Sequence, residues 1–238
     1  NLAHESDAVI PHFQAITDKV KAAGAVIVQQ IYHVGAHGDS DLSFQPHWSP
    51  SGGPSYHDSD GSHKMTEAEI DEVLEAHASA ARRAQACGFQ GVEVWAAYHS
   101  LIDQFWTPWS NQRDDQWGGS LENRMRYPLE VFAVMRAAWP AEKPMSVRIS
   151  AHDWIDGGVT PDEAVEIARM FRAAGADIID VSSGQTDPAE KPIYGRMFQT
   201  PFSDRIKNEA GIPTMTVGNI SDYDQVNGIL MAGRADLV

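Results

Sequence analysis

The sequence contains little cysteine, no long apolar run and no excess of basic residues. Cys87 is the only cysteine among 238 residues, which excludes a disulfide within the chain and an iron–sulfur cluster ligated by its own cysteines alone. We therefore expect a reducing, cytoplasmic setting. No run approaches the roughly 18 apolar residues that span a membrane, and no signal peptide is visible. The formal net charge of −15 argues against nucleic acid and membrane surfaces as partners.

Motifs that mark several other enzyme classes are also missing. No Gly-x-Gly-x-x-Gly turn follows any expected strand, so a dinucleotide-binding doubly wound fold gains no support. There is no P-loop and no Gly-x-Ser-x-Gly nucleophile elbow. The ten histidines show neither His-x-His nor His-Glu-x-x-His spacing, and we expect no metal site. Zinc is an alternative only in or beside one long loop, which contains or adjoins His37, His47, His57 and His63.

The sequence does contain a repeated alternation of short apolar runs with longer helical stretches. The short runs are rich in β-branched residues, which is typical of buried strands in a parallel sheet. Repeated βα units predict an α/β fold, with the sheet either doubly wound or closed as a barrel. Six strands are expected, at Val26–Val28, Gly91–Val94, Met145–Ile149, Asp177–Val181, Thr214–Val217 and Ala235–Val238.

Several helices carry recognisable start signals. Thr66 and Glu69 form a capping box, and Thr160 with Glu163 forms a second one around a proline at the first helical position. Ser221 is expected to cap the last helix.

The two ends of the chain predict an incomplete barrel. The first expected helix, Pro11–Ala23, has no strand before it, and the chain begins without methionine and stops on Leu237-Val238. We therefore expect one domain over residues 1–238, a (β/α)8 TIM barrel without its first two strands and without the end of its last βα unit. The segment from Asp39 to Lys64 has no periodicity, and so long a loop after a barrel strand is typical of the active-site face.

Gln30 and Arg148 are the first candidates for a binding site. Gln30 lies where a strand ends, and its amide suits the edge of a flavin pyrimidine ring; a polar strand end bonded to neighbouring backbone is the alternative. Arg148 lies inside an apolar strand, where a cation is costly unless an anion faces it. It could stabilise the negative charge of a reduced flavin, or form an internal ion pair with Glu93 or Asp180.

A second group of candidates follows the strand that begins at Gly91. Trp95 and Tyr98 combine aromatic surfaces with polar tips that could bind a substrate, and Tyr98 and His99 could act as general acids. Four nearby tryptophans form either a cation–π box for an alkylated amine or a hydrophobic subcore: Trp95, Trp106, Trp109 and Trp117.

Gly218 and Asn219 follow the expected strand Thr214–Val217. A glycine between a strand end and a helix N-terminus can approach a phosphate closely, and barrels often bind phosphate after their seventh and eighth strands. A simple turn is the alternative.

One long run, Leu101–Arg124, contains Leu-Ile-Asp-Gln-Phe, Ser-Asn-Gln-Arg-Asp-Asp and Gly-Gly-Ser-Leu-Glu-Asn-Arg. Together with Gln30–Gly35, Met65–Ile70, Val217–Ile220 and Gly233–Val238, this run resembles the old yellow enzyme family, also called the NADH:flavin oxidoreductase family. The resemblance covers nearly the whole chain and implies a (β/α)8 barrel that binds FMN and is reduced by NADH or NADPH.

The resemblance also implies roles for individual residues. Gln30 should contact the flavin's pyrimidine edge, Arg148 its N1 and C2-oxygen region, and Gly218 and Asn219 its phosphate. Ene-reductases of the family carry a His-x-x-His or His-x-x-Asn pair and then a tyrosine. Those positions read Trp95, Tyr98 and Ser100 here, which departs from the pattern for simple enone reduction.

Two parts of the chain are similar to different branches of that family. His33–Asp39 and Trp48–Gly52 are similar to N-methyl amino acid demethylases, in the branch that includes trimethylamine dehydrogenase. Ser146–Trp154, Ser182–Gln185 and Tyr194–Thr200 are similar to the reductase domain of salicylyl-CoA hydroxylase-type enzymes. The sequence is either a recombinant of two branches or a member of an intermediate subfamily.

The expected function is an FMN-dependent oxidoreductase that passes hydride from a reduced nicotinamide or an amine, through flavin N5, to an acceptor. Tyr98 and His99 would be catalytic, and Trp95 and Tyr98 would bind a small-molecule substrate. Two rivals are an incomplete barrel without catalytic activity of its own and a non-flavin phosphate-binding lyase or isomerase, although no strand ends in the lysine that such an enzyme would use. A homo-oligomer or further domains are possible partners.

Overall fold

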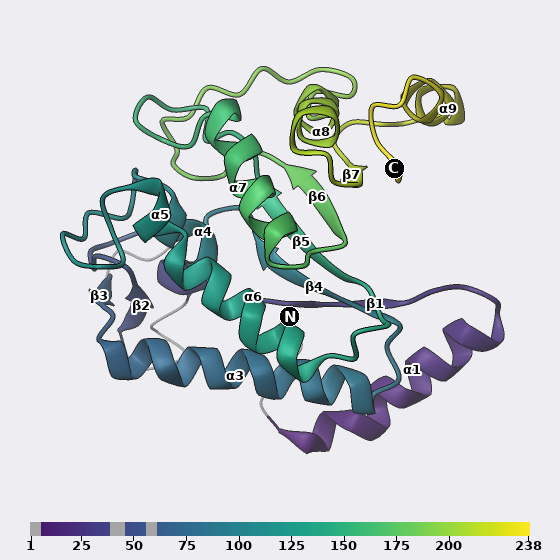
Figure 1. Ribbon diagram of the computed structural model, residues 1–238, viewed down its shortest axis with the longest axis horizontal. Coiled ribbons are helices and arrows are strands. Elements are labelled where there is room, and N and C mark those ends of the chain that lie inside the picture. The colour runs from purple at the N-terminus through teal and green to yellow at the C-terminus, as the bar shows by residue number, and fades with distance from the viewer. Residues whose placement is uncertain (1–5, 39–45, 56–60) are drawn as a thin grey trace.

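The computed structural model describes residues 6–38, 46–55 and 61–238. Within these residues one parallel sheet has the order β1-β4-β5-β6-β7 (Figure 1). Parallel neighbours require crossover connections, and helices supply them. The predicted α/β fold with a parallel sheet is therefore confirmed. The strands are β1 (Val28–Ile31), β4 (Gly91–Ala96), β5 (Met145–Ser150), β6 (Ile178–Ser182) and β7 (Thr214–Thr216).

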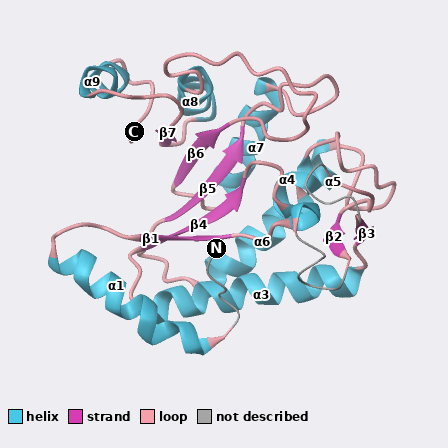
Figure 2. Cartoon of the chain, turned by 180° about the vertical axis from the view of Figure 1, so that it is seen from behind, coloured by secondary structure: helices cyan, strands magenta, loops and turns pink. Residues whose placement is uncertain are grey.

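Three of the longer helices cover one side of this sheet. Figures 1 and 2 view the chain from opposite sides, and both show α3, α6 and α7 on the same side of the strands. The longer helices are α1 (Ile10–Ala22), α3 (Glu67–Ala86), α6 (Arg126–Ala138), α7 (Pro161–Ala173) and α9 (Tyr223–Met231). The shorter ones are α4 (Leu101–Trp106), α5 (Leu121–Arg124) and α8 (Thr200–Arg205), which continues as a π-helical turn, Ile206–Ala210. No helix in the described ranges is both long enough and apolar enough to cross a bilayer.

The two faces of the sheet differ in chemistry because side chains alternate along a strand. One face is apolar and packs into the main hydrophobic core with the helices, through Val92, Val94, Val147, Ile149, Ile179 and Val181. The other face carries polar and charged side chains, and the strand register aligns Trp95, Arg148 and Asp180 in one row across it. This polar face is where binding chemistry is to be sought.

The helix caps largely follow the sequence. Both predicted capping boxes are present, at Thr66 with Glu69 and at Thr160 with Glu163. The prediction that Ser221 caps α9 is wrong. The side chain of Asp222 accepts a hydrogen bond from the Gln225 N–H at 2.8 Å and makes Asp222 the cap. Both residue types cap helices well, so their order alone does not choose between them.

Two strand predictions need correction. The first strand begins at Val28 and not at Val26, whose side chain is exposed. The last predicted strand, Ala235–Val238, is not a strand in the described chain. It makes one isolated bridge, between Leu237 and Met215, and two of its N–H groups converge on the carbonyl of Thr214, so no regular ladder forms.

The long segment from Asp39 to Lys64 is not wholly irregular. It contains two short parallel strands, β2 (His47–Ser49) and β3 (Ser62–Lys64). Residues 39–45 and 56–60, which include His57, lie outside the described residues.

Candidate active site

Arg148 lies in the middle of the polar face and is held by three neighbours. Its Nε donates to Ser182 Oγ at 3.0 Å, and its Nη2 donates to Tyr98 Oη at 3.0 Å. Its Nη1 lies 3.4 Å from Asp180 Oδ2. The rings of Trp95 and Tyr98 have their centroids 5.3 and 5.2 Å from the guanidinium carbon, within cation–π range. The structure thus brings three predicted site residues, Trp95, Tyr98 and Arg148, into one cluster.

Gln30 belongs to a neighbouring network on the same face. Its Nε2 donates to Glu93 Oε1 at 2.6 Å, and Ser146 Oγ donates to Glu93 Oε2 at 2.7 Å. Glu93 is buried, with both carboxylate oxygens bonded. With the amide nitrogen turned to Glu93, the amide oxygen of Gln30 has no hydrogen-bond partner among the described residues and can accept one.

Asp180 is the least satisfied polar group of the row. Its side chain is buried, and its Oδ1 has no hydrogen-bond partner within the described chain. Burial raises the pKa of Asp180 to about 6; the charge of Glu93 adds to the rise, and Arg148 opposes it. Buried carboxylate oxygens are rarely left without a hydrogen bond. An unbonded oxygen at Asp180 is therefore more typical of a functional site than of an ordinary protein interior.

Tyr98 owes its position to a strained turn after β4. Tyr98 and His99 both have φ near +55°, which costs about 1–2 kcal/mol for each non-glycine residue. Side chains hold the turn: Tyr98 N donates to Ser150 Oγ at 2.9 Å, and His99 N donates to Asp103 Oδ2 at 2.8 Å. The Tyr98 hydroxyl consequently reaches Ser182 Oγ, at 3.1 Å, as well as Arg148.

His99 is buried and turned to a different partner. Its Nδ1 lies 2.8 Å from Nε2 of His37, and Gln104 Nε2 donates to its carbonyl at 2.6 Å. Burial, and secondarily the charge of His37, lowers the pKa of His99 to about 3. The ring is therefore neutral at physiological pH. No hydrogen bond joins it to Tyr98 or Arg148 in the described structure.

The four tryptophans do not come together in one box, so of the two alternatives the cation–π box built from all four is not the one that the structure shows. Trp106 is fully buried against Phe171. Trp117 Nε1 donates to a glutamate at the start of α3, and Trp109 is partly exposed. Only Trp95 meets the polar row, where Tyr32 packs on its ring with centroids 5.3 Å apart.

Gly218 and Asn219 lie just beyond β7, on its C-terminal side. Gly218 has φ +107°, and a Cβ there would come within 2.6 Å of Gln199 Nε2. Asn219 also has positive φ, +54°. Their backbone N–H groups make no hydrogen bond within the described residues. The glycine is therefore required by the turn and by the close approach of Gln199, and the free N–H groups suit an anion.

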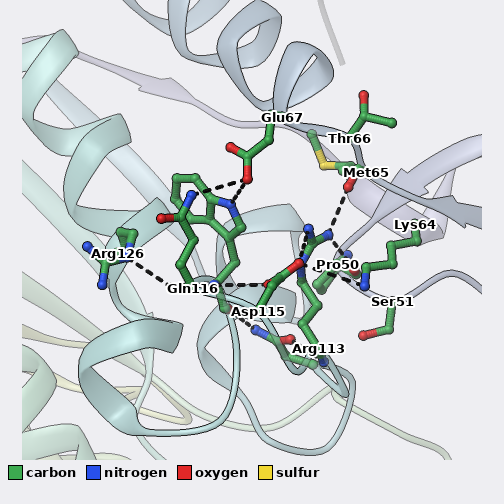
Figure 3. Close-up of polar contacts among 12 residues, drawn as sticks. Pro50, Ser51, Lys64, Met65, Thr66, Glu67, Arg113, Asp115, Gln116 and Arg126 are labelled. Carbon is green, nitrogen blue, oxygen red and sulfur yellow. Dashed lines mark hydrogen bonds and ion pairs between the residues drawn. The ribbon is translucent and has the colours of Figure 1, made fainter.

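The part of the recognisable run around Arg113 lies apart from this row and is structural. Arg113 Nη1 donates to the carbonyls of Pro50 and Met65 at 2.9 and 2.8 Å, and its Nη2 pairs with Asp115 at 2.7 Å. Figure 3 shows Asp115 beside Arg113, and Glu67 at the start of α3 in contact with Gln116. The run therefore ties the loop that contains β2 and β3 to the body of the fold.

Sequence reasoning missed three supporting residues, Ser150, Ser182 and Asp103. Ser182 lies two positions after Asp180 on β6, so the period-two alternation of a strand could have placed it on the polar face. Asp103 lies in the recognisable Leu-Ile-Asp-Gln-Phe motif, but nothing in the sequence assigns it the role of holding the turn. Within the described chain, no group of three or more His, Cys, Asp or Glu side chains is arranged to hold a metal, and zinc gains no support there.

Comparisons with known proteins point in one direction. A family model described as NADH:flavin oxidoreductase / NADH oxidase matches residues 2–238. An NADPH dehydrogenase of Clostridium acetobutylicum is 40% identical over 224 residues, 94% of this chain and 65% of that protein. The chain spans 63–67% of the length of this and two further NADPH dehydrogenases that it matches.

Two solved structures extend the likeness to the fold. A 2-naphthoyl-CoA reductase in complex with 2-naphthoyl-CoA is 29% identical with a TM-score of 0.90, covering 98% of this chain and 38% of that one. An old yellow enzyme homologue from Zymomonas mobilis is 27% identical with a TM-score of 0.81, covering 98% of this chain and 67% of that one. These are (β/α)8-barrel enzymes, so the architecture predicted for this chain, part of such a barrel, is confirmed.

Proposed function

Because the chain belongs to the NADH:flavin oxidoreductase / NADH oxidase family, we propose that it works as an FMN-dependent oxidoreductase, with NADH or NADPH as reductant and a small molecule as acceptor. The observation that carries this proposal is Arg148, a guanidinium held on the polar face of the sheet by Ser182, Tyr98 and Asp180. A preorganised cation at this position suits a cofactor that gains negative charge on reduction.

Gln30 and Arg148, both on the polar face, fit the pyrimidine edge of a flavin. Gln30 offers an amide oxygen that can accept from a ring N–H, and the Arg148 guanidinium carries N–H groups that can donate to a ring carbonyl. Bound FMN would supply the two-electron chemistry that no side chain of the row can perform. Gly218 and Asn219 would hold the phosphate through their backbone N–H groups.

The acceptor would lie against Trp95 and Tyr98. The Tyr98 hydroxyl can donate to a carbonyl oxygen, with Arg148 at 3.0 Å from that hydroxyl to support the charge that builds up there. His99 enters this proposal through its backbone, as part of the turn that aims Tyr98, and not as a proton-donating imidazolium.

A conjugated carbonyl compound is the acceptor class that this arrangement favours. The likeness to a structure of 2-naphthoyl-CoA reductase bound to its thioester supports an aryl or enoyl thioester. An amine cation is less suited, because the Arg148 guanidinium already lies against both Trp95 and Tyr98 and two cations would repel each other there.

The visible spectrum of the purified chain tests the proposal. The protein is mixed with FMN, desalted and titrated anaerobically with NADPH and NADH. We expect a retained yellow chromophore that bleaches with one of the two reductants. A chain that folds by circular dichroism but retains no FMN would refute the proposed activity for this chain. Riboflavin in a parallel sample measures what the phosphate contributes, and FMN should be retained better.

A further inference from the structure

The polar face of the sheet contains more negative than positive charge. Arg148 is its one cation within the described residues, whereas Asp180 and Glu93 both contribute carboxylates. Both acids are buried, at 3% and 5% exposure, so water screens them poorly. A group that acquires a further negative charge beside Arg148 must compete with Asp180 for the same guanidinium.

The two carboxylates differ in their hydrogen bonds. Glu93 has a donor on each oxygen, Gln30 on Oε1 and Ser146 on Oε2. Asp180 has a single contact, the Arg148 pair at 3.4 Å, and its Oδ1 has no partner in the described structure. Any loss of its share of Arg148 would therefore favour the protonated form of Asp180.

No other charged or titratable group of the described chain changes this balance. The elements beside Asp180 present Arg148 from β5, Glu93 from β4 and the Tyr98 phenol from the turn after β4. Its register partner on β7 is Met215, which does not titrate. Within the described chain, the charges that act on Asp180 are therefore those of Arg148 and Glu93.

We propose that Asp180 takes up one proton from solvent when the flavin is reduced, which frees the Arg148 guanidinium to balance the added negative charge. This inference rests on the proposed function. The balance is: reduced nicotinamide passes one hydride to the flavin, which becomes singly negative, and the nicotinamide leaves oxidised. Asp180 changes from carboxylate to carboxylic acid with one solvent proton. Reoxidation by the acceptor releases that proton or passes it through Tyr98 and Ser182.

The proton count of flavin reduction separates this role from a purely structural one. The midpoint potential of the bound flavin is measured against pH between 6.5 and 8.5, a range chosen above the pKa of about 6 that Asp180 has beforehand. For a two-electron couple, each proton taken up contributes about 30 mV per pH unit. A hydride is equivalent to one proton and two electrons, so forming the singly negative reduced flavin takes up one proton per two electrons. Protonation of Asp180 takes up a second.

We therefore expect a slope of about 59 mV per pH unit in the wild-type protein and about 30 in Asp180→Asn. The ultraviolet spectrum of the reduced flavin should be that of the anion in both, which excludes a second proton on the flavin itself. Asp177→Asn, an exposed position three residues earlier in the same segment, is the matched control and should keep the wild-type slope. Glu93→Gln tests the other buried acid: because the charge of Glu93 helps to raise the pKa of Asp180, the second proton should be retained but shifted toward the lower end of the pH range.

The outcomes are distinct. A yellow wild-type protein with a slope of about 30 mV per pH unit overturns the inference and leaves the proposed function standing. An equal slope in Asp180→Asn and wild type also overturns the inference and leaves the proposed function standing. If Glu93→Gln loses the second proton while Asp180→Asn keeps it, the proton belongs to Glu93 instead. A chain that retains no FMN overturns both proposals at once.

Discussion

Arg148 and Asp180 are register partners on neighbouring strands, and their side chains meet with Nη1 and Oδ2 3.4 Å apart. Replacing a buried ion pair by apolar residues of similar volume is often neutral or stabilising, so the pair is poorly explained by stability. The Nε and Nη2 atoms of Arg148 are fixed by hydrogen bonds to Ser182 and Tyr98. This geometry is better explained by a preorganised cation, and the first prediction tests that directly.

Arg148→Lys should weaken FMN binding while the protein stays folded. Lysine keeps the positive charge beside Asp180 but loses the planar fork of donors. Loss of one or two charge-assisted hydrogen bonds corresponds to roughly 10- to 100-fold in Kd. Quenching of FMN fluorescence on titration measures this. Arg169→Lys, on the exposed surface of α7, is the control, and equal Kd values in both variants would remove Arg148 from the cofactor site.

Tyr98→Phe should separate the two half-reactions. The substitution removes the hydroxyl that bonds Ser182 and Arg148 but keeps the ring against Trp95. Reduction of the flavin by NADPH should be nearly unchanged, whereas reoxidation by a conjugated carbonyl acceptor should slow by about 100-fold. Stopped-flow absorbance follows each half-reaction separately. Reoxidation at the wild-type rate would show that the acceptor draws no proton from Tyr98.

Features that depend only on neighbouring residues could be predicted from the sequence. A cation inside the apolar strand at Arg148 had to meet an anion, and Asp180 was one of the two acids proposed. The alternation of apolar and polar side chains along β5 also follows directly from its residues. The left-handed turn at Tyr98 and His99 could not be anticipated, because non-glycine residues rarely have positive φ and the bonds that hold it come from Asp103 and Ser150.

Long-range register explains the remaining differences. Gln30 bonds Glu93 because β1 and β4 align these two residues across the sheet, and pairing between strands far apart in sequence is not encoded in either strand alone. The run around Arg113 was the most recognisable part of the sequence, yet its contacts are with backbone carbonyls of a distant loop. Around Arg113, the recognisable sequence therefore marks a structural contact and not the candidate site.

Arg113→Ala should destabilise the fold without changing the flavin potential. Its side chain is 4% exposed, and its removal leaves the carbonyls of Pro50 and Met65 without their donors. Leaving each of these buried carbonyls without a donor costs about 1–3 kcal/mol. Urea unfolding measures the loss, and limited proteolysis should cut the loop between α1 and α3 first. Gln112→Ala, an exposed neighbour, should cost much less; an equal loss in both variants would contradict the anchoring role.

The buried acid Asp103 should make stability depend on pH in an unusual direction. Burial, and secondarily the charge of Asp153, raises the pKa of Asp103 well above its ordinary value of 3.8. Below pH 3.8 the group is protonated in both states. Above it, the unfolded chain releases the proton while the folded protein keeps it, so the free energy of unfolding falls as pH rises until the folded pKa is passed.

Asp103→Asn should therefore flatten this pH dependence, because an amide resembles the protonated acid and its oxygen can still accept from the His99 N–H. Relative to wild type, the variant should gain stability between pH 5 and pH 8 in urea unfolding. Asp115→Asn supplies a control of opposite sign, since hydrogen bonds from Arg113 lower the pKa of Asp115 and its contribution is lost as pH falls through that lowered value. If Asp103→Asn lost stability progressively as pH rose, Asp103 would be ionised in the folded protein, and the Tyr98–His99 turn would be held by a carboxylate rather than by a protonated acid.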